Sequence, residues 1–205
     1  MMNRLELISW ATGALMLAAL SACGNNDANP SPPPASSSSP TASSSSASPA
    51  SPSDQAAAHA TDLVRRYFVT LDEVRTKPAS SLSRLKAVAI GTQLTAQTKL
   101  VKEGRQRGLR QVGSTRIAHL TVQSINLDNS DPSSGKVPTV TVDVCWDVSD
   151  ADLVDKNGQS VVSPDRPDRG WTRYTVANYH WGSDPSGGWR ITSSQDLKQT
   201  PCAAS

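Results

Sequence analysis

The 205-residue chain has little excess charge of either sign: 20 Lys and Arg residues stand against 18 Asp and Glu residues, which leaves a formal net charge of +2. This balance argues against a nucleic-acid partner, because such proteins usually concentrate positive charge. The chain also lacks a Gly-rich phosphate loop, and Gly182-Ser183-Asp184 lacks the second glycine that shapes a nucleophile elbow. The sequence therefore contains no motif for phosphate-loop nucleotide binding or for serine-hydrolase catalysis.

Metal ligands are equally scarce. His59 and His119 lie far apart in the sequence, and neither has a cysteine or carboxylate at ligand spacing. The oxygen-rich run from Asp147 to Asn157 lacks the Gly and the Glu that a calcium-binding loop requires at its sixth and twelfth positions. The sequence predicts no metal site and no cofactor.

Aromatic residues are absent between residues 24 and 53, and Thr41 is the only β-branched residue there. The stretch consists almost entirely of Ser, Pro, Ala and Asn. Such a composition cannot bury enough apolar surface to offset the entropy of ordering the chain. Residues 23–53 are therefore predicted to form a flexible tether, either an unmodified spacer or a glycosylated stalk.

The N-terminus does contain a hydrophobic run. It follows Arg4, extends from Leu7 to Leu20, and ends in Leu20-Ser21-Ala22-Cys23. The run is too short to span a bilayer comfortably. Its ending resembles the lipobox of bacterial lipoproteins, which consists of an aliphatic residue, two small residues and an obligatory cysteine.

The lipobox resemblance implies that residues 1–22 are a signal peptide cut before Cys23, and that the Cys23 sulfur carries a diacylglyceryl group. Two acyl chains give a nearly permanent anchor. The expected location is the cell membrane, with the rest of the chain outside the cytoplasm. The alternative is an ordinary secretory signal that happens to contain a cysteine.

Residues 54–205 are numerous enough for one domain with its own core. Once Cys23 is assigned to the lipid, Cys145 and Cys202 remain. A pair of cysteines outside the cytoplasm favours one disulfide, which would attach the C-terminal tail to the sheet. Two separate reduced cysteines are the alternative.

The domain begins with helical periodicity. Asp54 is the predicted N-cap of a helix that ends at Lys77-Pro78. The apolar positions of this helix recur at the spacing of one buried face: Ala60, Leu63, Val64, Tyr67, Phe68, Leu71 and Val74. Two further helical stretches are predicted, one starting at Ser80 or Ser81 and one from about Thr92 to Arg107.

After Gly113 the pattern alternates, which is typical of strands. Val140, Val142, Val144, Trp146 and Val148 are expected on one face of a strand, with Thr141, Asp143, Cys145 and Asp147 on the other. Strands are predicted at residues 116–127, 139–148, 171–181 and 189–196, with an Asn157-Gly158 hairpin turn between residues 153–154 and 161–162. Helices followed by an antiparallel meander predict an α+β fold.

The strand Trp171-Thr172-Arg173-Tyr174-Thr175-Val176 and the closing Gly188-Trp189-Arg190-Ile191 add a resemblance. Together with the element order, they resemble the cone-shaped α+β fold of the nuclear transport factor 2 (NTF2)-like family. The layout of lipobox, tether and such a domain is similar to lipoproteins of high-GC Gram-positive bacteria. The resemblance implies a binding or accessory module in a cell-envelope assembly. Its partner would be an envelope protein or a small ligand, and a homodimer through the open sheet face is possible.

The NTF2-like family also includes dehydratases, isomerases and cyclases, which suggests the alternative of an acid-base enzyme or small-molecule binder. The candidate catalytic residues are Asp143, Tyr174 and His180. A carboxylate beside an imidazole can abstract a proton next to a carbonyl, while a tyrosine hydroxyl stabilises the resulting oxyanion. The simpler interpretation is that these polar residues form the solvated face of a sheet. We expect a binding protein rather than an enzyme.

Two further groups have both a structural and a functional interpretation. The basic face of the third helix would be either solvated surface or a contact for anionic lipid or wall polymer. The tryptophans of the sheet region would fill the core or line a ligand pocket. The residues of the basic face are Lys99, Lys102, Arg105, Arg107 and Arg110. The tryptophans are Trp146, Trp171, Trp181 and Trp189.

Overall fold

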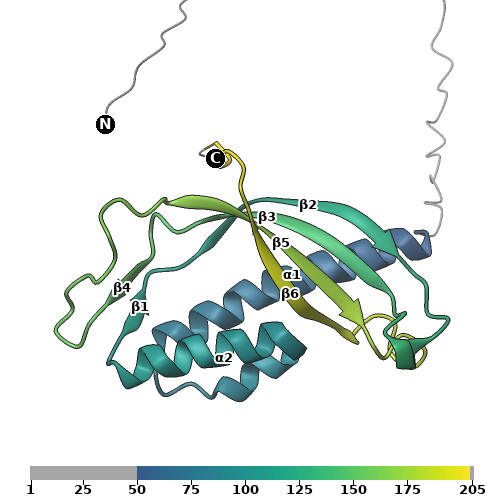
Figure 1. The fold of residues 1–205 in the computed structure, drawn as a ribbon, viewed down its shortest axis with the longest axis horizontal. Helices are drawn as coiled ribbons and strands as arrows, with labels where there is room; N and C mark the ends of the chain where they lie inside the picture. The colour runs from purple at the N-terminus through teal and green to yellow at the C-terminus, as the bar shows by residue number, and fades with distance from the viewer. Residues whose placement is uncertain (1–49, 204–205) are drawn as a thin grey trace, which may run out of the picture. The chain divides into compact units, whose positions relative to one another are not determined.

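A four-stranded antiparallel sheet curves over two α-helices, which lie on its concave side (Figure 1). The computed structural model describes residues 50–203. The predicted lipidation site Cys23, the predicted signal peptide and residues 24–49 of the predicted tether lie outside the described residues. The predicted α+β class, with the N-terminal helices packed on an antiparallel sheet, is confirmed.

The sheet contains its strands in the order β2-β3-β5-β6, and every neighbouring pair is antiparallel. A separate two-stranded sheet pairs β1 with β4. The strands are β1 (Arg110–Val112), β2 (Arg116–Asn126), β3 (Thr139–Asp147), β4 (Asp152–Val154), β5 (Arg169–Asn178) and β6 (Trp189–Leu197).

Helix α1 (Pro52–Thr76) supplies most of the helical part of the core. Its N-cap is Ser51, so the predicted cap Asp54 is wrong by three residues. Asp54 instead completes a capping box, in which its carboxylate accepts from the Ser51 backbone N–H at 3.2 Å. All of the predicted face is buried: Ala60, Leu63, Val64, Tyr67, Phe68, Leu71 and Val74.

The other helices are shorter. The second helical stretch is the 3₁₀-helix η1 (Leu82–Ala87), which is capped by Ser81. Helix α2 (Gly91–Gln106) buries Gln93 and Val101, whereas the side chain of Leu100 is 58% exposed. A further 3₁₀ turn, η2 (Pro132–Ser134), lies in the loop between β2 and β3.

Strand β3 shows the predicted alternation. Val140, Val142 and Val144 are fully buried on the face that packs on the helices. The opposite, outer face was expected to be solvated, yet Asp143 and Asp147 are almost completely buried. The outer face is therefore covered by ion pairs and by the C-terminal tail.

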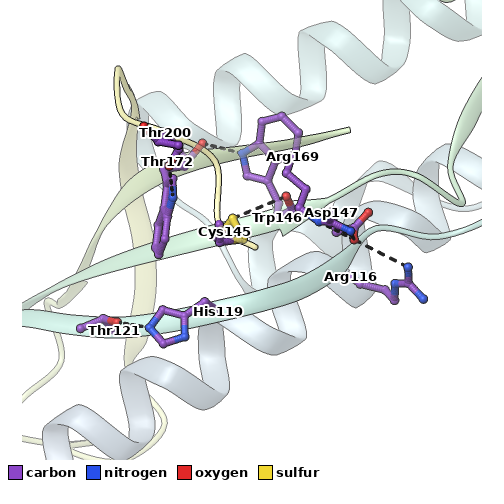
Figure 2. Close-up of a disulfide and its surroundings, with 11 residues drawn as sticks. Arg116, His119, Thr121, Cys145, Trp146, Asp147, Arg169, Thr172 and Thr200 are labelled. Carbon is purple, nitrogen blue, oxygen red and sulfur yellow. Dashed lines mark hydrogen bonds and ion pairs between the residues drawn. A yellow bond between two sulfur atoms is a disulfide. The ribbon is translucent and has the colours of Figure 1, made fainter. Parts of the chain in front are cut away.

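The disulfide between Cys145 and Cys202 is present, which confirms the predicted pairing. Its Cα atoms lie 6.2 Å apart, and 57 residues separate the two cysteines in sequence. The bond attaches the tail to the outer face of β3 (Figure 2). The Trp171 indole N–H donates to the Thr200 carbonyl at 3.2 Å, and His119 packs edge-on against the Trp171 ring.

Asp147 ends β3 in a cluster of charges on the same outer face (Figure 2). Its carboxylate lies 2.8 Å from the Arg169 guanidinium and 3.7 Å from that of Arg116. Hydrogen bonds from Ser149, followed by the contact with Arg169, hold the pKa of Asp147 well below its usual range. The cluster fixes the loop that leads from β3 to β4.

Strand β4 differs from the prediction. Asn157-Gly158 does form a turn, in which Gly158 adopts a φ of +81°, but residues 161–162 form no second strand. Only a single bridge joins Val154 to Ser160, and β4 pairs instead with the distant β1. This non-local pairing places the β1–β4 sheet beside α1 and α2.

Within residues 50–203, no helix combines the length with the apolar character that crossing a membrane requires.

Candidate functional site

The predicted catalytic residue Asp143 lies on the outer face of β3. Both of its carboxylate oxygens accept hydrogen bonds at 2.7 Å from the guanidinium of Arg173 on β5. Arg173 is the partner of Asp143 in the strand register, so the pair is a bidentate cross-strand ion pair. The Asp143 carboxylate is thus paired with Arg173 on the side of the sheet that faces away from the helices.

Tyr174 lies on the opposite, concave face. In the register it pairs with Val142, next to the Asp143–Arg173 pair. Successive side chains of a strand point to opposite faces, so Tyr174 and Asp143 cannot meet. The Tyr174 ring packs edge-on against Tyr67 and Phe68 of α1, with centroid distances of 5.7 and 5.9 Å.

His180 lies beyond the end of β5 and is exposed. The strand ends at Asn178 because the Asn178 side chain closes the following turn, accepting from the His180 backbone N–H and donating to the Asp184 carbonyl, both at 2.8 Å. The predicted catalytic trio of Asp143, Tyr174 and His180 is therefore not assembled. One member faces outward, one faces the helices, and one lies in a turn.

The structure does contain a pocket on the concave side of the sheet, with a volume of about 430 Å³. We call it the concave pocket. Helix α1 provides Phe68, Leu71 and Arg75, helix α2 provides Gln93 and Gln97, and the sheet closes the far side. Lining residues from the sheet and its loops include Trp146, Val148, Arg166, Thr172, Tyr174, Ser194 and Asp196.

The polar groups of the concave pocket are held in place by one another. The Gln93 amide donates to the Tyr67 hydroxyl, and the Ser194 hydroxyl donates to the Gln93 amide oxygen at 2.9 Å. The Trp146 indole N–H donates to Thr172 at 3.1 Å, and the Thr172 hydroxyl donates to Asp196 at 2.8 Å. Such linked networks fix side-chain orientation before any ligand enters.

The two tyrosines of the concave pocket remain protonated at neutral pH. Burial raises the pKa of Tyr174 far above its usual range, with Tyr67 and Asp196 adding to the rise and Arg75 opposing it. Burial also raises the pKa of Tyr67, against the effect of the Gln93 hydrogen bond and of the Arg75 charge. Both hydroxyls therefore keep their proton and are not general bases at neutral pH.

A second hollow of about 330 Å³ adjoins the concave pocket and shares Arg75, Thr115, Val148 and Arg166 with it. We call it the arginine groove. It runs between α1, α2 and the β1–β4 sheet. Its apolar lining includes Leu100, Val101, Leu109 and Leu153, and its charged lining is Arg75, Arg105, Arg110, Arg166 and Asp152.

The basic helix face predicted from the sequence is divided in the structure. Arg105 folds back onto the end of α1, where it donates to the Val74 carbonyl at 2.7 Å. Lys99 forms an exposed pair with Glu103, and Arg107 is exposed. Arg105 and Arg110 therefore belong to the arginine groove, while the other three cations belong to the surface.

The tryptophans are divided in the same way. Trp189 is buried in the core and packs edge-on against Trp181. Trp146 lines the concave pocket, and Trp171 lies on the outer face beneath the tail. Of the four, Trp146 is the one that lines the concave pocket.

The sequence patterns did not predict several of the pocket residues. Tyr67 and Phe68 were predicted only as core, and Arg75 and Gln93 carried no motif. Arg75 lies on α1 and Gln93 lies on α2, 18 residues later in the sequence. They come to line one pocket only because α2 packs beside α1, and the spacing in the sequence does not predict this packing. Among residues 50–203, no cluster of three or more His, Cys, Asp or Glu side chains is arranged to hold a metal ion.

No family model matches the chain, and no curated protein matches it. One similar solved structure is the crystal structure of the intermembrane space region of the chloroplast protein ARC6, which is 23% identical. The match covers 69% of this chain and 95% of that chain, with a TM-score of 0.47. A likeness at this level carries no argument about function.

Proposed function

We propose that this chain is a membrane-anchored extracytoplasmic lipoprotein whose NTF2-like domain acts as a binding module in the cell envelope. The anchor is proposed from the lipobox ending at Cys23 and the Ser/Pro tether that follows it. The NTF2-like assignment is proposed from the curved sheet over α1 and from the strand motifs around Tyr174 and Trp189.

The observation that carries the binding role is the concave pocket. It is an open hollow of about 430 Å³, bounded by aromatic rings and by polar groups that are already held in hydrogen bonds. That volume and lining suit a small ligand. Catalysis by Asp143, Tyr174 and His180 has no comparable support, since the three side chains are apart.

Substituting Cys23 with serine is expected to abolish acylation and to leave residues 1–22 attached, because serine has no thiol to accept the diacylglyceryl group. The measurement is detergent phase partition of the expressed chain together with its intact mass. Ser21→Ala is the matched control, since it keeps a small residue in the lipobox and should be processed normally. A wild-type chain with a free Cys23 thiol would refute the anchor.

Fluorinated fragments are expected to bind the full chain in phosphatidylcholine nanodiscs, and Ser194→Trp should weaken that binding at least about fivefold. Ser194 is exposed at the mouth of the concave pocket, so a tryptophan there fills the opening. ¹⁹F line broadening provides the measurement, with empty nanodiscs as background.

Gln195→Trp is the matched control for the blocking variant. Gln195 pairs with Arg173, on the outer face, so the same large side chain is added without entering the concave pocket. Equal binding by both variants and the wild type would place the fragments elsewhere and contradict the proposed binding role.

A further inference from the structure

We propose that the concave pocket recognises an apolar molecule that carries a single carboxylate, with Arg75 and the hydroxyl of Tyr174 holding the carboxylate. This inference rests on the proposed binding function and specifies the ligand class. It uses the charge and hydrogen-bond capacity that the pocket residues leave unused.

Arg75 supplies the positive charge. It is half-buried near the end of α1 and lines both the concave pocket and the arginine groove. One of its terminal nitrogens donates to the Gln97 side-chain oxygen at 2.8 Å, which fixes the guanidinium in the wall. Among residues 50–203, no carboxylate lies within ion-pair distance of Arg75. A partly desolvated arginine without a counter-ion is suited to bind an anion.

Tyr174 supplies a second donor. The side chain lines the concave pocket, where its hydroxyl lies beside Thr172, whose own hydroxyl donates to Asp196 at 2.8 Å. The ring packs edge-on against Tyr67 and Phe68, which fixes the position of the hydroxyl. From this fixed position the hydroxyl can donate a hydrogen bond to an incoming carboxylate oxygen.

The adjoining arginine groove strengthens the preference for an anion. The two buried side-chain atoms that lack a hydrogen-bond partner in the described part of the chain are the Nε atoms of Arg105 and Arg166, and both arginines line this groove. The lining contains four arginines and one aspartate, Asp152, whose carboxylate accepts from the Ser160 hydroxyl at 2.9 Å. The local field is therefore positive.

The walls next to these charges are apolar and would receive the body of the ligand. Leu71, Trp146 and Val148 line the concave pocket, and Leu100, Val101, Leu109 and Leu153 line the groove. Leu100 and Leu153 are among the large apolar side chains that remain exposed. Covering them with a hydrocarbon or aryl group would remove apolar surface from water.

Two aspartates limit the charge of the ligand. Asp72 accepts from the Gln111 side chain at 2.7 Å and from the Thr115 backbone at 2.9 Å, while Asp196 stands at the exposed edge. Their negative charges lie on the same concave pocket as Arg75. Together with Arg75 and Arg166 they leave the wall of the concave pocket without net charge, so Arg75 can pair with one carboxylate, whereas the second charge of a phosphate dianion would face the aspartates.

The test compares 4-(4-fluorophenyl)butyrate with its uncharged amide, using ¹⁹F NMR on the full chain in phosphatidylcholine nanodiscs. The two probes have the same shape and differ in charge. The carboxylate is expected to bind at least about tenfold more tightly than the amide, because charged hydrogen bonds contribute more than neutral ones. Arg75→Gln and Tyr174→Phe should each weaken carboxylate binding, by about tenfold and about threefold, and weaken amide binding less, because the amide carbonyl is an uncharged acceptor.

Arg107→Gln is the matched control, because Arg107 is exposed and lines neither hollow. Arg75→Lys should retain part of the preference for the carboxylate. A merely structural role of Arg75 would weaken both probes equally. Equal binding of acid and amide that Ser194→Trp removes would overturn the carboxylate assignment but leave the binding role standing. Failure of both probes, together with failure of the fragment set, would overturn both proposals.

Discussion

Replacing Cys202 with serine is expected to lower the free energy of unfolding by about 4 kcal/mol. The disulfide with Cys145 closes a loop across 57 residues, so its loss releases a large amount of chain entropy in the unfolded state. A loss of this size is a large share of the stability of an ordinary domain. The measurement is guanidinium denaturation of the full oxidised chain, followed by tryptophan fluorescence.

Cys202 is a better position for this test than Cys145. Cys145 is fully buried, so Cys145→Ser would add the cost of burying a hydroxyl, whereas Cys202 is only half-buried in the tail. Gln199→Ser is the matched control, because it changes the tail but keeps the cross-link. Reduction of the wild type should reproduce the Cys202→Ser curve. A difference below about 1 kcal/mol would mean that the unfolded chain gains little freedom when the bond is absent.

The helix and the central strand could be predicted because their patterns are local. The face of α1 from Ala60 to Val74 follows from helical spacing, and the valines of β3 follow from strand alternation. The cysteine pair could be predicted because only two thiols remain once Cys23 is assigned elsewhere. The helix and strand predictions each used the residues of one segment, and the disulfide prediction used the number of cysteines. None of them required knowledge of how the segments pack.

The candidate site could not be predicted because it depends on register and packing. The sequence allowed Asp143 and Tyr174 to share one site, but the pairing of Asp143 with Arg173 places Tyr174 beside Val142 on the other face. A one-residue change in register reverses the face of every side chain, and no single strand pattern encodes it. Arg75 similarly becomes part of a pocket only through the position of α2, which no local sequence pattern predicts.

The pairing of β4 with β1 has the same origin. The local Asn157-Gly158 signal correctly predicts a turn, but the partner strand is about 40 residues away in sequence and carries no matching pattern. The arginine groove lies against this small sheet, so its lining could not be anticipated from the order of strands. The loop that leaves β1 is consequently a position where one substitution should have a large effect.

Substituting Gly113 with alanine is expected to destabilise the domain by roughly 3 kcal/mol or more. Gly113 follows β1 and has a φ of +70°, a conformation that side chains disfavour. A Cβ atom there would lie 1.7 Å from the Asp150 carbonyl oxygen and 3.3 Å from the Ala151 Cα. Backbone atoms cannot rotate out of the way as a side chain does, so the loops would have to separate. Chemical denaturation of the full chain measures the loss.

Gly158→Ala is the control that separates the two causes. Gly158 has a similar φ of +81°, but a Cβ atom there would meet nothing within 4 Å. It should cost only about 1 to 2 kcal/mol, the usual penalty of a left-handed conformation. The excess loss in Gly113→Ala then measures the contact with Asp150. The Gln111 side-chain amide donates hydrogen bonds to Asp72 and to the Gly113 carbonyl. Displacing this loop should therefore also loosen the wall that the concave pocket and the arginine groove share at Thr115. Equal losses in the two variants would show instead that the loop at Asp150 yields without cost.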